Sequence, residues 1–86
     1  MITHKTHPNI VARLKRASGH LTSVIAMLEA QKPCVDIAQQ MQAVEAAITK
    51  AKRELINDHI QHCLEPGHVE NPETALVELR QIAKFL

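Results

Sequence analysis

The chain has 86 residues, enough for one small domain and too few for a large core of its own. Its net charge of +1 excludes a strongly basic or acidic protein, and its one aromatic residue, Phe85, argues against surfaces that stack single-stranded bases or RNA. No apolar run is long enough to span a bilayer and no secretory signal is visible, so we expect a cytoplasmic protein with no membrane partner. The two cysteines do not resemble a secreted disulfide framework.

The first predicted element is a helix that opens at "THPNIV", where Pro8 suits a first helical turn, after a flexible tail of residues 1–7. Its apolar residues recur alternately every four and three positions, the spacing of a helix that packs along a seam. Gly19 interrupts the pattern at a cost of about 1 kcal/mol against alanine, which close approach of another helix would offset. The seam consists of Ile10, Leu14, Ala17, Leu21, Val24 and Leu28.

Residues 34–64 predict a second, long helix, because they follow Pro33 and contain neither glycine nor proline. Their apolar positions again alternate by four and three. At 1.5 Å per residue this helix is a rod of about 45 Å, which the shorter first helix cannot cover, so we expect partner chains along it. Its seam consists of Ile37, Met41, Val44, Ile48, Ala51 and Leu55.

Pro66 and Gly67 end the rod, and residues 66–71 form a linker to a short third helix. Asn71 is its predicted cap and Pro72 its first residue. No strand is predicted, so the fold class is all-α: one domain over residues 1–86, a three-helix protomer with a long central helix. The apolar face of the third helix consists of Leu76, Leu79, Ile82 and Leu86.

Basic residues gather in two parts of the chain, residues 5–16 and 50–53, while acids concentrate near the C-terminus. Charge alone favours solvated helix faces, although a symmetric assembly would repeat them into an extended basic surface. The basic residues are Lys5, Arg13, Lys15 and Arg16, and then Lys50, Lys52 and Arg53.

Cys34, His59 and Cys63 share one side of the predicted second helix, within about 20° at 100° per residue. Cys34 nevertheless lies about 37 Å along the axis from His59, whereas metal–ligand bonds measure about 2.0 to 2.3 Å. Two copies packed antiparallel would bring the residues together in two equal sites. Thiolate and imidazole ligands suit Cu(I), Zn(II), Ni(II) or Co(II). Geometry leaves a second interpretation equally open. In it the cysteines are small apolar residues that pack in the core, and the histidine interacts favourably with the helix dipole.

Three stretches together resemble a known family, the small all-helical metal- and formaldehyde-responsive repressors of the CsoR, RcnR and FrmR type. "RLKRASGHL" is similar to its basic first-helix motif, which ends Gly-Gln or Gly-His. "CVDIAQQMQAVEAAI" is similar to its Cys-x-x-x-x-Gln-Gln segment, and "DHIQHC" to the His-x-x-x-Cys end of its second helix. The resemblance covers most of the chain, and the joint spacing of the cysteines and His59 is highly specific.

The resemblance implies an antiparallel dimer that assembles into a tetrameric disc and binds double-stranded operator DNA. It implies that a bound effector releases the DNA and derepresses an efflux or detoxification operon, with no organic cofactor. It places Cys34, His59 and Cys63 on the metal ligands, and we expect Glu78 to hydrogen-bond the free nitrogen of His59. The residues that fall in regions of DNA contact are Arg13, Lys15, Arg16, Lys50 and Arg53.

The effector is predicted from details of the resemblance. Cys-His-Cys is the family's Cu(I) pattern, but copper sensors often carry a tyrosine where this chain has Pro33. Nickel and cobalt sensors add N-terminal nitrogen ligands, and this chain offers His4 and His7. We therefore predict a Ni(II)/Co(II) sensor, with a Cu(I) sensor as the alternative and Zn(II) able to bind the same residues. The absence of an N-terminal proline disfavours a formaldehyde sensor, and His59 disfavours a persulfide sensor.

An enzyme is not expected. The sequence has no nucleophile–base pair with an orienting group, no glycine-rich phosphate loop and no paired carboxylates. A structural helical bundle, indifferent to both metal and DNA, is the remaining rival interpretation.

Overall fold

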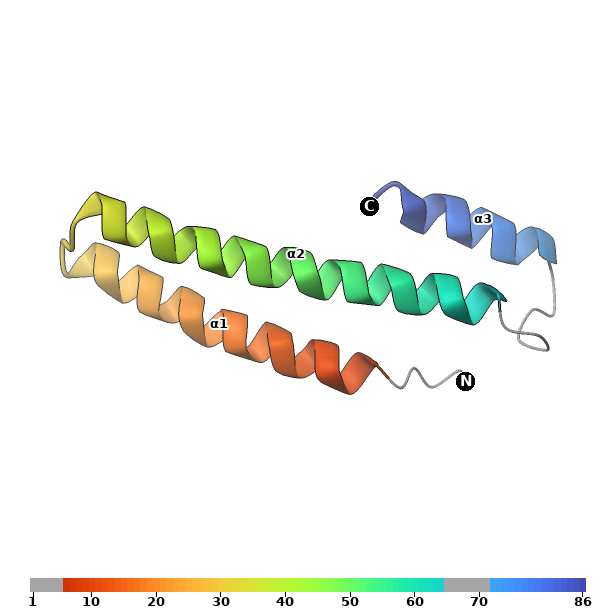
Figure 1. Cartoon of the computed structure of the whole chain (residues 1–86), viewed down its shortest axis with the longest axis horizontal. Helices are drawn as coiled ribbons and strands as arrows, with labels where there is room; N and C mark the ends of the chain where they lie inside the picture. Colours follow the sequence, from red (N-terminus) through yellow and green to blue (C-terminus); the bar gives the residue numbers. More distant parts are fainter. Residues whose placement is uncertain (1–5, 65–71) are drawn as a thin grey trace.

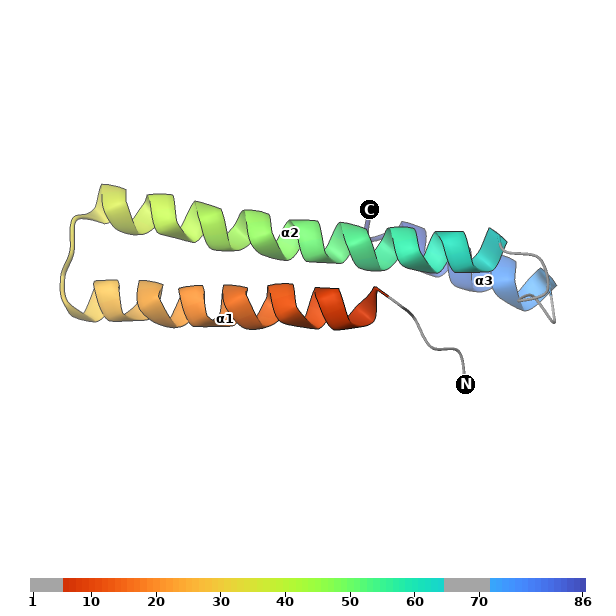
Figure 2. The ribbon, with the colours of Figure 1, turned by 60° about the horizontal axis from the view of Figure 1, so that its bottom comes forward.

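The computed structural model describes residues 6–64 and 72–86, which form three α-helices and no strand (Figure 1). The helices are α1 (His7–Glu29), α2 (Cys34–Leu64) and α3 (Pro72–Ala83). α1 and α2 lie side by side and antiparallel, and α3 folds back along the C-terminal part of α2 (Figures 1 and 2). The predicted all-α class with a long central helix is confirmed. No helix within the described ranges is long and apolar enough to cross a membrane.

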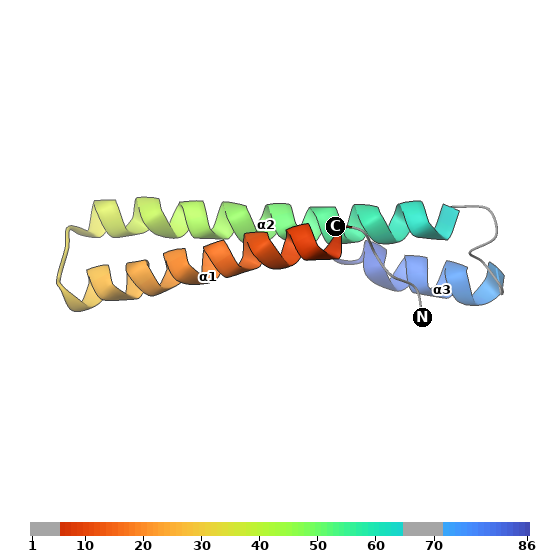
Figure 3. The same ribbon diagram turned by 90° about the horizontal axis from the view of Figure 1, so that it is seen from below.

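The protomer is an elongated body with extents of 55 × 23 × 14 Å, only one or two helices thick. α2 contacts both other helices, whereas α1 and α3 do not pack on each other. Seen from below, they follow one another along α2 (Figure 3). A body this thin buries little apolar surface within one chain.

α1 begins where the sequence predicts, around its first proline. The backbone N–H of Ile10 donates to the carbonyl oxygen of Thr6 at 3.1 Å, which closes the first turn. Of the predicted tail over residues 1–7, residues 1–5 lie outside the described part of the chain, and His7 is the first residue of α1.

α2 and α3 also begin at the predicted positions. The carbonyl oxygen of Pro33 accepts the first helical hydrogen bond of α2, from the N–H of Ile37 at 3.1 Å. Pro72 opens α3, where its missing N–H has no helical partner to lose. The predicted cap Asn71 and the linker over residues 66–71 lie outside the described residues.

The chain reverses between α1 and α2 through a Schellman motif. The N–H of Lys32 donates to the carbonyl oxygen of Met27 at 3.0 Å, and the N–H of Gln31 donates to that of Leu28 at 3.1 Å. Gln31 has a φ of 55°, the left-handed conformation that this motif requires and that glycine usually supplies. The motif satisfies the last carbonyl groups of α1 and turns the chain directly into α2.

The two predicted seams divide into a buried row and an exposed row, each spaced by seven residues. The buried row joins α1 to α2, and Ile56, which lies five residues after Ala51 and outside the predicted seam, is buried as well, at 1% exposure. The exposed row remains 40–55% accessible in the protomer. The buried residues are Ile10, Ala17, Val24, Ile37, Val44, Ala51 and Ile56; the exposed ones are Leu14, Leu21, Leu28, Met41, Ile48 and Leu55.

The apolar face of α3 is only partly buried. Leu79 and Ile82 are half-buried, whereas Leu76 and Leu86 are exposed. Gly19 on α1 is exposed, and apart from its chain neighbours and the nearby backbone of α1, a Cβ built on it would meet no atom of the described residues within 4 Å. The close helix approach expected at Gly19 therefore does not come from the described helices of its own protomer.

Candidate metal and DNA-binding sites

The predicted metal ligands lie at opposite ends of α2. Cys34 is the first residue of the helix and is exposed, whereas His59 is half-buried near the last turns, with Cys63 one turn further on. A rise of 1.5 Å per residue separates Cys34 from His59 by about 37 Å. Within residues 6–64 and 72–86, no three histidine, cysteine or acidic side chains gather closely enough to hold a metal ion. Within the described part of one protomer, Cys34 and His59 therefore lie too far apart to bind the same metal ion.

The start of α1 lies against the His59 end of α2. His7 Nε2 is 3.6 Å from an oxygen of Asp58, whose side chain is only 12% exposed. An N-terminal imidazole is thereby held beside the residue that precedes His59. His4, the other predicted N-terminal ligand, lies outside the described residues, and Glu78 is exposed on α3.

Two of the predicted DNA contacts line a groove between α1 and α2. The groove has a volume of about 260 Å³. Arg13 donates from Nε to Glu54 at 3.1 Å, with both side chains about one-third exposed, while Arg16 is exposed. The groove is lined by Arg13, Arg16, Ala17, His20 and Ala47.

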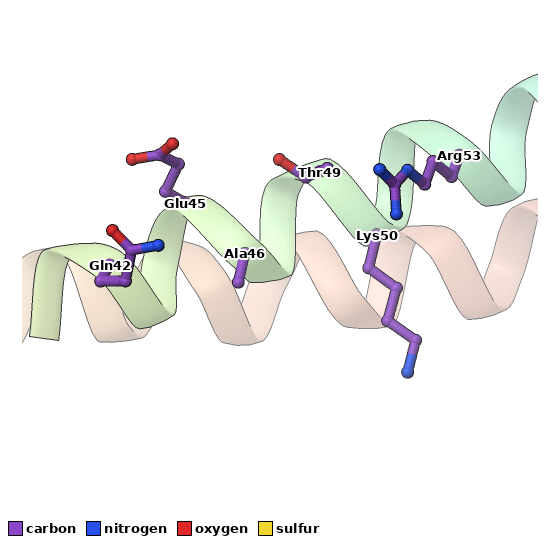
Figure 4. A pocket seen from close by; sticks show the side chains of 6 residues that line it. All are labelled: Gln42, Glu45, Ala46, Thr49, Lys50 and Arg53. Atoms are coloured by element: carbon purple, nitrogen blue, oxygen red, sulfur yellow. The ribbon is translucent and has the colours of Figure 1, made fainter. Parts of the chain in front are cut away.

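A second basic surface lies on α2, where Lys50 and Arg53 border a shallow pocket of about 470 Å³ (Figure 4). Because Ala46 lines this pocket and Ala47 lines the groove, the two basic surfaces adjoin each other around α2. Lys15 is exposed on α1 but lines neither. The pocket is lined by Gln42, Glu45, Ala46, Thr49, Lys50 and Arg53.

The structure adds a contact that the sequence did not predict. His20, which is not one of the seam residues, is half-buried and places Nε2 2.6 Å from Oε1 of Gln40 on α2. The only signal in the sequence was that His20 ends the first-helix motif and Gln40 ends the Gln-Gln segment. Their pairing depends on how the two helices are aligned, which neither motif states.

Comparison with known proteins gives consistent matches. The profile of a family described as metal-sensitive transcriptional repressor matches residues 6–85. The copper-sensing transcriptional repressor CsoR of Bacillus subtilis (strain 168) is 35% identical over 81 residues, covering 93% of this chain and 80% of that protein. The CsoR of Mycobacterium ulcerans (strain Agy99) is 35% identical over 74 residues, covering 85% of this chain and 63% of that protein.

A third relative is the copper-sensing transcriptional repressor RicR of Mycobacterium tuberculosis (strain ATCC 25618 / H37Rv), 32% identical over 56 residues. That match covers 65% of this chain and 58% of RicR. The chain therefore spans less than two thirds of the length of these mycobacterial relatives. No solved structure matches it significantly.

Proposed function

Because the chain belongs to the metal-sensitive transcriptional repressor family, we propose that it binds operator DNA when metal-free and releases it when a metal ion binds between subunits. The family is one of transcriptional repressors and not of enzymes, in line with the predicted lack of a catalytic site. Release of the repressor would derepress an operon for metal efflux.

We infer that Cu(I) is the effector. The relatives are named for copper sensing, which supports the alternative of the sequence prediction better than its Ni(II)/Co(II) interpretation. Two thiolates and one imidazole form a soft donor set that suits Cu(I). The thiols must lose their protons to bind, so metal affinity would rise with pH.

The observation that carries the proposal is the position of the exposed apolar row on α2. A two-fold axis at Ile48 in an antiparallel pair of α2 helices would place Met41 opposite Leu55 of the partner subunit, so the exposed row would cover itself. By residue count, the same axis would place Cys34 opposite position 62 of the partner subunit, which lies between His59 and Cys63. A pairing that buried the apolar row would therefore also bring the donor set together.

The proposed mechanism couples the two ends of α2 to the basic surfaces between them. Cys34 would hold the metal from one subunit, and His59 and Cys63 would hold it from the other, which fixes the relative position of two rigid helices. A coupling free energy of roughly 1–3 kcal/mol is typical of such linkage and is enough to weaken DNA binding markedly. Attraction to phosphates would dominate the DNA affinity, so the affinity should fall steeply with salt.

A Ni(II)/Co(II) sensor is the second candidate, and one contact favours it. His7 lies beside Asp58, so an additional nitrogen ligand is available near His59. Under this alternative, His7→Ala would weaken the response to Ni(II) and Co(II), whereas under the Cu(I) proposal it would leave the response to Cu(I) unchanged.

Operator binding tests the function directly. We expect fluorescence anisotropy with the upstream promoter duplex to show tight binding by the metal-free protein and release on addition of Cu(I). Cys34→Ala should bind the DNA with an affinity within about twofold of wild type, because Cys34 lies outside both basic surfaces, yet should no longer respond to metal. Normal metal-driven release by Cys34→Ala would disprove the inter-subunit site, and failure of the metal-free protein to bind any promoter DNA would disprove the repressor.

A further inference from the structure

The contact between His20 and Gln40 orients the imidazole. The amide of Gln40 is oriented with Oε1, which only accepts, 2.6 Å from Nε2 of His20, and this orientation assigns the hydrogen to Nε2 as the donor. In the neutral ring the other nitrogen, Nδ1, is then a bare acceptor. In the protonated ring Nδ1 becomes a second donor while the bond to Gln40 is kept.

The surroundings of His20 attract anions. Arg13 and Arg16 line the same groove on α1, and Arg16 has no carboxylate partner among the described residues. α2 is the only described helix packed on α1, and it faces His20 with Gln40 and Ala47, neither of which titrates. The carboxylate of Glu54 bonds Arg13 further along the groove.

We propose that this groove receives one backbone phosphate of duplex DNA, and that His20 takes up a proton from solvent as the phosphate binds. The inference rests on the proposed function and adds His20 to its DNA contacts, with Gln40 positioning the ring. Neutral His20 presents a lone pair that repels a phosphate oxygen, whereas protonated His20 presents an N–H and a positive charge. The bond to Gln40 holds the ring in the groove in both states, so protonation changes its charge and not its position.

The direction of the pH effect follows from the proton that His20 takes up when DNA binds. Because the bound state holds one more proton per groove than the free state, DNA affinity should increase as pH falls. One coupled proton changes the dissociation constant by up to about tenfold per pH unit across the range in which imidazole titrates. Release of DNA on raising the pH would then occur without any metal.

The test compares operator affinity at about pH 6 and about pH 8, at fixed salt, for three metal-free proteins. The wild type should bind at least about threefold more tightly at the lower pH. His20→Gln, which keeps a hydrogen-bonding side chain but cannot titrate, should lose most of this difference. His62→Gln, which removes an imidazole from the last turn of α2, should keep it. An equal pH dependence in wild type and His20→Gln would overturn the inference.

Long-range ¹H–¹⁵N NMR of the histidine rings gives an independent readout. At the higher pH, His20 of the free protein should show the Nε2–H tautomer, and addition of operator duplex should protonate Nδ1. Inorganic phosphate at the same total phosphate concentration should leave the ring unchanged; an equal response would reassign the groove to a free anion and overturn its assignment to DNA. If DNA binds while His20 stays neutral, the inference about His20 is overturned and the proposed function stands. If no DNA binds at all, both the inference and the proposed function are overturned.

Discussion

At the scale of single residues, the structure distinguishes basic side chains that the sequence treats alike. Arg16 lines the groove between α1 and α2, next to His20, whereas its neighbour Lys15 is exposed and lines neither basic pocket. Successive residues on a helix point about 100° apart, so two adjacent cations cannot face the same phosphate. Position around the helix, and not charge alone, decides which cation can contact DNA.

We predict different effects for the two substitutions. Arg16→Ala should weaken operator binding and lower the slope of log affinity against log salt by about 0.9, the value for one lost phosphate contact. Lys15→Ala, which removes the same charge from the adjacent position, should change the slope much less. Salt titrations of DNA binding by anisotropy measure both. Equal slopes for the two variants would show that the groove is not part of the DNA interface.

At the scale of the elements, the short connection between α1 and α2 sets the alignment on which every inter-helix contact depends. Gln31 adopts a left-handed conformation there, while the N–H groups of Gln31 and Lys32 close the Schellman motif. A non-glycine residue in this conformation costs roughly 1 kcal/mol. The connection therefore keeps its geometry despite an unfavourable residue.

Gln31→Gly should consequently stabilise the protein by about 0.5–1 kcal/mol, measured as the free energy of unfolding in urea. Lys32→Gly is the matched control, because among the described residues Gln31 is the only non-glycine residue with positive φ. That control should destabilise, since glycine there only adds freedom to the unfolded chain. Destabilisation by Gln31→Gly would contradict the left-handed assignment.

At the scale of the whole molecule, the protomer is thin and leaves apolar side chains exposed. Its long axis is 55 Å and its shortest extent 14 Å, and a row of apolar side chains remains exposed on each of α1 and α2. Contiguous exposed apolar surface of this kind marks an interface. The row on α2 is centred on Ile48, so the proposed two-fold axis buries the apolar row and assembles the metal ligands in one step.

Ile48→Glu tests this arrangement. The axis would place two carboxylates against each other in an apolar interface, so we expect sedimentation velocity to show loss of the dimer and metal titration to show loss of tight binding. Ile48→Leu preserves the apolar volume and should keep both properties. An intact oligomer in Ile48→Glu would place the two-fold axis elsewhere.

The sequence by itself determined the helices of this protein. Periodicity and the prolines gave the extent of α2 from Cys34 to Leu64 and the start of α3 at Pro72, because these signals act within a few residues along the chain. It also showed that Cys34 and His59 lie too far apart on one helix to bind one metal, since helical rise depends only on residue count.

Only the tertiary structure decided which half of each seam is buried. Ala17 and Leu21 are both apolar and both on the seam, yet Ala17 packs inside the hairpin and Leu21 faces outward. Periodicity gives the direction of a side chain around its own helix, but not which surface that direction meets. The pairing of His20 with Gln40 and the placement of His7 beside Asp58 arise for the same reason, because they depend on the alignment of two helices set by the turn at Gln31.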